Sequence, residues 1–119
     1  MIGDIISNYL VSQGIEVDKN IYIDFSKYKD NSIAIFHTGG LEPDITNKIE
    51  YPTIQITTRY KDNAQVKAKQ IQRLLNSLEN IELEGVRILW CHSLQEPTFM
   101  GLENDNRIFI CNFLFHIAV

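Results

Sequence analysis

The sequence predicts an α+β domain of two layers, in which two helices pack against a mixed, mostly antiparallel sheet. Two segments carry apolar residues at helical spacing, and the other apolar segments show the alternation or the short runs typical of strands. Most of these strands follow one another without a helix between them, which favours antiparallel neighbours. The length of 119 residues fits a single domain, over residues 1–119, with one core.

The N-terminal segment predicts a helix over residues 2–13. Its apolar side chains recur at helical spacing, and Gly14 occupies the position at which a glycine ends a helix. A strand follows, which begins near Val17 and in which Ile21 and Ile23 alternate with more polar neighbours. The polar stretch 26–31 predicts a turn, and the apolar run 32–37 predicts a second strand, so we expect a hairpin-like connection between the two strands.

Residues 38–52 predict a long loop, because they contain Gly39, Gly40 and Pro43 and end at Pro52. Loops of this length are often functional, and we expect this one to be a mobile arm that orders on contact with a partner. Residues 53–60 then alternate cleanly between two faces and predict a strand.

The second predicted helix spans residues 62–79, with Asp62 or Asn63 as its N-cap. Its apolar stripe predicts the face that packs on the sheet, and consists of Ala64, Ala68, Ile71, Leu75 and Leu78. Two more strands are predicted, at 86–92 and at 107–119. The last strand is apolar on both faces, so we expect both to be covered, one of them by a folded-over hairpin or by another subunit.

The chain carries 11 basic and 15 acidic side chains, and this balance argues against a generic nucleic-acid or membrane surface. No apolar run approaches the roughly 20 residues that a membrane span needs, and the N-terminus lacks the basic region of a secretory signal. We therefore expect synthesis in a reducing cytoplasm.

No pattern predicts a catalytic, cofactor or metal site. Cys91 and His92 are adjacent in a strand and Cys111 and His116 are five residues apart, so within each pair the side chains point to opposite faces. We interpret the cysteines as buried free thiols, with a single disulfide between them as the alternative. No nucleophile elbow and no phosphate-binding loop is present in the sequence, so we expect no enzyme.

The charges are segregated along the chain, and this predicts a head-to-tail subunit interface. A basic segment lies at 59–73 and an acidic one at 79–105. We expect the basic side chains of one subunit to face the acidic ones of the next, with a plain solvated surface as the alternative. The candidate interface residues are Arg59, Lys61, Lys67, Lys69 and Arg73 on the basic side, and Glu82, Glu84, Glu103 and Asp105 on the acidic side.

Three short motifs, in this order, resemble those of the minor capsid or tail terminator (tail completion) proteins of long-tailed bacteriophages and prophages. The resemblance runs through nearly the whole chain. The motifs are G-G-x-x-P at Gly39, Gly40 and Pro43; P-x-I-x-I-x-x-R at Pro52, Ile54, Ile56 and Arg59; and R-x-x-x-x-N-F at Arg107, Asn112 and Phe113.

The resemblance implies a structural virion protein without cofactor. Such a protein forms a hexameric ring at the head-proximal end of the tail tube, ends tube growth and offers a joining surface to the head connector or stopper protein. DNA passes through the lumen of the ring without specific binding. Two alternatives stay open on the sequence: another head-completion or tail tube protein of the same particle, and a small non-enzymatic bacterial binding domain.

Overall fold

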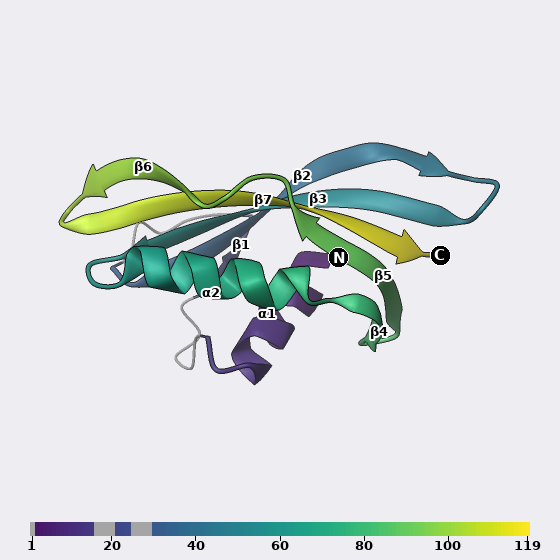
Figure 1. Ribbon diagram of the computed structural model, residues 1–119, viewed down its shortest axis with the longest axis horizontal. Coiled ribbons are helices and arrows are strands. Elements are labelled where there is room, and N and C mark those ends of the chain that lie inside the picture. The colour runs from purple at the N-terminus through teal and green to yellow at the C-terminus, as the bar shows by residue number, and fades with distance from the viewer. Residues whose placement is uncertain (1, 16–20, 25–29) are drawn as a thin grey trace.

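A computed structural model describes residues 2–15, 21–24 and 30–119. Two helices, α1 (Ile2–Ser12) and α2 (Ala64–Asn76), accompany a curled sheet built from β1 (Ile21–Ile23), β2 (Ser32–Asp44), β3 (Ile49–Tyr60), β4 (Glu79–Leu83), β5 (Val86–Ser93), β6 (Thr98–Glu103) and β7 (Asn106–Ala118). Figure 1 shows both helices on the same side of the sheet. The predicted α+β class, with two layers and a mixed, mostly antiparallel sheet, is confirmed.

The strand order is β1-β2-β3-β7-β5-β4, and β6 pairs with β7 beside β5. One edge of β7 therefore pairs with β3, while its other edge pairs with β6 through residues 106–110 and with β5 through residues 113–118. All pairs are antiparallel except β1 with β2, which is parallel. The expected hairpin-like connection between β1 and β2 is therefore wrong, and the turn predicted at 26–31 falls mostly outside the described residues, as does Val17.

The helix α1 begins and ends close to where the sequence predicts. Gly14 has a φ of 80°, and the chain closes in a Schellman motif: the backbone N–H of Ile15 donates to Leu10 O at 3.0 Å, and that of Gly14 to Val11 O at 3.0 Å. Ile15 is buried directly after this turn, which is the apolar contact that accompanies such an ending.

The helix α2 buries the stripe predicted for it, and its stripe packs on β3, β5 and β7. Leu75 is fully buried, and Leu78 stays in the core although the helix has already ended. Asn63 occupies the N-cap position, but its side chain makes no capping hydrogen bond, because the residue adopts a left-handed conformation with φ 60°. The prediction of the packed face is thus confirmed, and that of a side-chain cap is wrong.

The long loop predicted at 38–52 is instead the outer half of a hairpin, which we call the arm. In the arm, β2 and β3 stay paired with each other as far as Asp44 and Ile49, and a turn at residues 45–48 joins them (Figure 1). The end of β7 lines the other edge of β3 here, with Ala118 opposite Ile49. The glycines and Pro43 lie at irregularities of the ladder between β2 and β3, whose register shifts between His37 and Gly40 and again between Leu41 and Asp44. Gly40 has a φ of 140°, and a Cβ there would lie only 2.2 Å from the carbonyl oxygen of Tyr51. This close approach of β2 to β3 therefore requires glycine at position 40.

Two strands are absent from the sequence prediction, and both belong to tight hairpins. β4 reaches β5 through Glu84 and Gly85, and β6 reaches β7 through Asn104 and Asp105. All four turn residues have positive φ, as a two-residue turn of type I′ demands.

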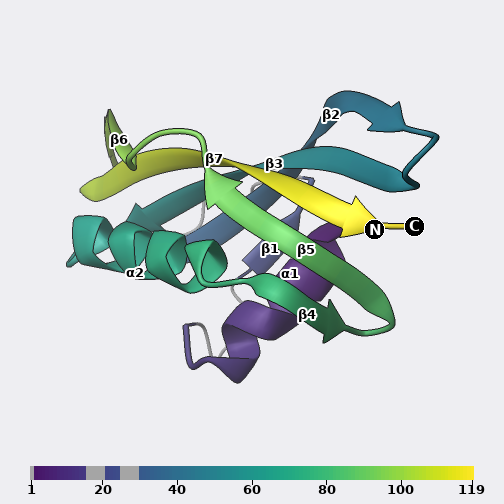
Figure 2. The same cartoon turned by 45° about the vertical axis from the view of Figure 1, so that its right-hand side comes forward.

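The sheet face turned away from the helices carries no helix in the described part of the chain (Figures 1 and 2). On β7 the face toward the helices is buried, from Phe109 to Ile117 in alternation, and the opposite face is only half-buried. The opposite face is thus not covered within the described part of one subunit, and its expected cover by another subunit stays a prediction. We call this uncovered surface the open face.

Candidate functional site

Arg59, the first of the predicted interface residues, lies inside its own subunit. Its side chain is only 4% exposed, and its guanidinium pairs with Glu103 through Nη1 and Oε2 at 3.2 Å. Nη2 also donates to the backbone oxygen of Glu103 at 3.4 Å. Arg59 and Glu103 are thus brought together as predicted partners of opposite charge, but across the β6–β7 hairpin and not across a subunit boundary.

Three of the other basic candidates also contact groups of the same chain. Lys61 pairs with Asp30 at 3.0 Å, and Lys69 pairs with Glu96. Lys67 donates to the backbone oxygen of Ile15 at 3.3 Å and lies over the ring of Tyr60. Charge segregation in the sequence therefore overstates how much basic surface the folded subunit offers to a neighbour.

Arg73 and the remaining acidic candidates are exposed. Arg73 lies on the outer side of α2, Glu82 and Glu84 lie on the β4–β5 hairpin, and Asp105 lies in the β6–β7 turn. Glu84 accepts a hydrogen bond from Asn8 Nδ2 at 3.0 Å. The structure does not bring these residues together within one subunit, so their role between subunits stays a prediction.

A polar network behind Arg59 fixes the start of β7. Asn106 is fully buried, and its Nδ2 donates to Asp30 Oδ1 at 2.7 Å and to the backbone oxygens of Asn104 at 3.0 Å and Glu103 at 3.2 Å. Its Oδ1 accepts from the backbone N–H of Asn31 at 3.4 Å. The hydrogen bond from Asn106, followed by the one from Lys61, lowers the pKa of Asp30.

The arm ends in a hydrogen-bonded turn with an exposed apolar tip. The carboxylate of Asp44 accepts from the backbone N–H of Asn47 at 3.1 Å and from its Nδ2 at 2.8 Å, and these bonds lower the pKa of Asp44. Ile45, at the start of this turn, is 86% exposed, more than any other large apolar side chain in the described part of the protein. Leu41, further back along β2, is also exposed. Such exposure favours a partner surface for the tip.

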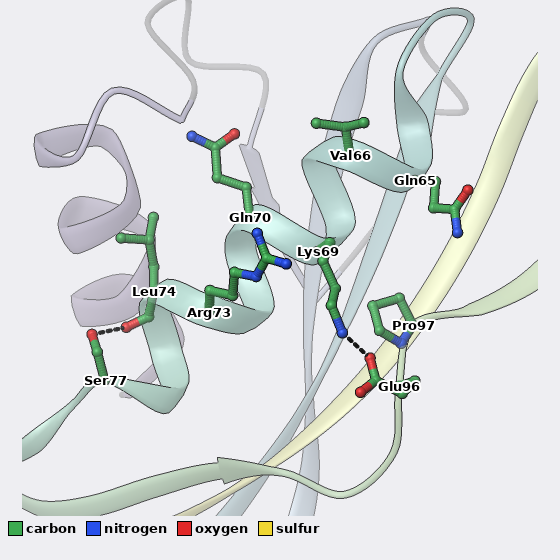
Figure 3. A pocket seen from close by; sticks show the side chains of 9 residues that line it. All are labelled: Gln65, Val66, Lys69, Gln70, Arg73, Leu74, Ser77, Glu96 and Pro97. Atoms are coloured by element: carbon green, nitrogen blue, oxygen red, sulfur yellow. Dashed lines mark hydrogen bonds and ion pairs between the residues drawn. The ribbon is translucent and has the colours of Figure 1, made fainter.

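A groove runs along the outer side of α2, and we call it the α2–β6 groove. Its first section, of about 560 Å³, lies between the start of the helix and β6, and is lined by Val66, Phe99, Phe109 and Arg107 among others. A second section of about 1040 Å³ shares Val66 and continues to Lys69, Arg73 and Pro97. Figure 3 shows the second section, with Lys69 reaching Glu96 across it.

The open face carries a cluster of rings that the sequence does not reveal. His92 and His116 lie 5.5 Å apart between ring centroids, Trp90 lies 5.5 Å and 5.7 Å from them, and Tyr51 lies 5.0 Å from His116. Burial, and next to it the nearby His92, lower the pKa of His116. This shift favours the neutral form of the His116 ring.

Both cysteines are free and buried, as predicted. Burial raises the pKa of the Cys91 thiol, and that of Cys111 to about 11, which favours the protonated thiol over the thiolate in both. They face the helices, whereas His92 and His116 face the other way, which confirms the predicted separation. Within residues 2–15, 21–24 and 30–119, no three His, Cys, Asp or Glu side chains gather where they could hold a metal ion.

The missed residues have weak signals in the sequence. Ile45 sits in a polar turn, and Phe99 lies in a short strand interrupted by Gly101, where the β6–β7 ladder shifts register. For Ile45 the signal that could have identified it is a large apolar residue in a segment that is otherwise polar. For Phe99 the signal is a short apolar run with Met100 and Leu102 between polar residues. Neither helix of the described chain is long and apolar enough to cross a membrane.

We compared the sequence with known proteins and protein families. No curated protein matches the sequence. The family of bacteriophage tail terminator proteins matches residues 9–118, which is nearly the whole chain. This confirms the resemblance drawn from the three sequence motifs. The chain belongs to the bacteriophage tail terminator family, and its role is that of a structural component of a phage tail.

Proposed function

We propose that this protein forms a closed ring at the head-proximal end of the phage tail tube. The ring ends tube growth on one side and joins the head on the other, through a head connector or stopper protein. The single observation that carries the proposal is the family match over residues 9–118. The resemblance described above implies six copies in the ring.

The two ends of the subunit differ in a way that suits such an assembly. The arm lies at one end of the long axis, and β6 and the start of α2 lie at the other (Figure 1). A contact between unlike ends is heterologous, and repeated heterologous contacts close into a ring when the rotation between copies returns to its start. This asymmetry supports a ring more directly than the balance of charges does.

The charges have a smaller role in the proposal. Exposed ion pairs are each worth about 0–1 kcal/mol, so contacts between Arg73 and neighbouring carboxylates such as Glu82, Glu84 and Asp105 tune register and do not create the ring. Lys61, Lys67 and Lys69 already have partners within the subunit, so they contribute to a contact between subunits only if they give up those partners. The net charge of −4 suits a lumen through which DNA slides without sticking.

A capping experiment tests the proposal. Purified tail tubes are incubated with fluorescently labelled protein, and fresh tube protein is then added while tube length is followed by electron microscopy. We expect label at one end of each tube and no further growth from that end. Label spread along the tubes, or unchanged growth in its presence, would contradict the proposed role.

A further inference from the structure

We infer that the arm of one subunit binds in the α2–β6 groove of the next copy of this chain, with Ile45 inserted between Val66 and Phe99. The inference rests on the proposed ring and names the contact that closes it. Four features of the subunit carry it: an apolar tip without cover, a groove of matching character, opposite charge at the two sites, and their places at opposite ends of the molecule.

The tip is prepared for binding. Ile45 is held in place by the hydrogen bonds from Asn47 to the Asp44 carboxylate, and the strands behind it are paired up to Asp44 and Ile49. A side chain presented by a preordered turn loses little conformational freedom on binding, so more of its apolar burial appears as affinity. A single exposed isoleucine is ordinary, but Ile45 stands in the turn at the end of the arm and is 86% exposed, with no cover from the described part of its own subunit.

The first section of the groove has exposed apolar side chains that an isoleucine could contact. Val66 is 65% exposed and Phe99 is 52% exposed, and they face the first section of the groove from α2 and from β6. The ring of Phe99 lies 5.5 Å from that of the buried Phe109, which forms the floor. An inserted isoleucine would therefore contact two side chains that are now wet and one that already belongs to the core.

The charges around the two sites are complementary. The arm carries Glu42, Asp44 and Glu50 against one basic residue, Lys48. The groove has exposed Arg107 in its first section and exposed Arg73 further along α2, and Glu96, its one acidic lining residue in the described part of the chain, is paired with Lys69. Complementary charge of this kind sets orientation and partner choice, while the apolar contact supplies the affinity.

The two sites cannot meet within one subunit. The molecule is 48 Å long, and the arm and the start of α2 lie toward opposite ends of this axis in Figures 1 and 2. The contact therefore joins two copies head to tail. It leaves a free tip and a free groove at the ends of any open chain of subunits, and these are used up only when the ring closes.

A mixing experiment with the full chain tests the inference. Ile45→Asp spoils the tip and leaves the groove intact, whereas Phe99→Asp spoils the groove and leaves the tip intact. We expect each variant to remain monomeric at concentrations at which the wild type assembles, because a charge forced against an apolar partner should raise the half-assembly concentration more than about tenfold. A 1:1 mixture should form a heterodimer and nothing larger, since only one functional tip–groove pair exists in it.

Thr46→Asp is the matched control for the tip, because it adds the same charge to the same turn at a polar, exposed position. It should assemble like the wild type, and circular dichroism should show all three variants folded. Sedimentation velocity measures the masses. Variants that assemble normally would overturn the inference, as would folded monomeric variants whose mixture gives no heterodimer.

The outcomes also separate this inference from the proposed function. Variants that form normal rings but no longer bind tail tubes would show that the tip binds the tube protein instead, which overturns the inference and keeps the ring. A wild-type protein that stays monomeric at every concentration would contradict the proposed ring itself.

Discussion

Replacing Leu75 by Asp is expected to unfold the subunit at room temperature. Leu75 is fully buried on the face of α2 that packs against β3, β5 and β7. The new carboxylate would have no partner there, and such an unpaired buried charge costs about 4–5 kcal/mol or more. Domains of this kind have about 5–15 kcal/mol of total stability, so the loss removes most or all of it.

Urea unfolding followed by circular dichroism measures the effect. Gln70→Asp is the matched control: it places the same residue on the same helix at an exposed position, and should change the free energy of unfolding by less than about 1 kcal/mol. Leu75→Ala should lie between the two, with a loss of about 3 kcal/mol from the cavity alone. If Leu75→Asp unfolds at the same urea concentration as the control, the assignment of the packed face is wrong.

Replacing Asn106 by Leu is expected to destabilise the subunit by about 3–4 kcal/mol, although the side chain keeps a similar size. The variant would remove the donor to the backbone oxygens of Glu103 and Asn104 and the acceptor for the backbone N–H of Asn31. Each buried backbone N–H or C=O that is left without a hydrogen bond lowers the free energy of unfolding by about 1–3 kcal/mol, and by less where the group can turn toward water.

Asn112→Leu is the control for this substitution, because it makes the same change on the same strand at a half-buried position of the open face. It should cost less than about 1 kcal/mol of unfolding free energy.

A second readout is the pKa of Asp30, measured by NMR. Asn106 lowers this pKa in the wild type, and it should rise toward its ordinary value in the Asn106→Leu variant. A carboxyl group whose pKa is lowered by folding stabilises the folded state at pH values above its ordinary pKa. This stabilisation is lost as the pH falls through the lowered pKa. The variant should therefore lose less stability than the wild type on acidification below pH 4. An unchanged pKa of Asp30 would show that the network does not act as described.

Much of the fold follows from local pattern. The two helices and the strands at β3, β5 and β7 have strong periodicity over many residues, and the packed face of α2 is fixed by the spacing of Ala64 to Leu78. The face assignment of Cys91 against His92 needs only the alternation of a strand. Patterns of this kind depend on neighbours in sequence, which is why the sequence predicts them.

The remainder depends on contacts between distant residues. Gly39, Gly40 and Pro43 read locally as a loop, and only the pairing of β2 with β3 turns them into an arm. The parallel pairing of β1 with β2 depends on how the chain crosses between them. Arg59 lies on the strand face that it shares with the polar Gln55 and Thr57, yet its side chain is buried and pairs with Glu103 of β6.

The candidate surfaces were predicted less well than the fold, for the same reason. Charge along the sequence indicates which residues could pair, but not whether the pair forms within one subunit or between two. The ring cluster at Trp90, His92 and His116 arises because β5 and β7 bring residues together that are more than twenty positions apart in the chain. The exposure of Ile45 becomes visible only once the pairing of β2 with β3 places this residue in the turn at the end of the arm.

The mass of the wild-type protein in solution tests the central claim, a closed ring of identical subunits, most directly. Light scattering coupled to gel filtration should give a single assembled species whose mass is a small whole-number multiple of 13.8 kDa, six by the resemblance, and does not grow further as concentration rises. A monomer at every concentration would contradict the account, and so would a polymer whose mass increases without limit.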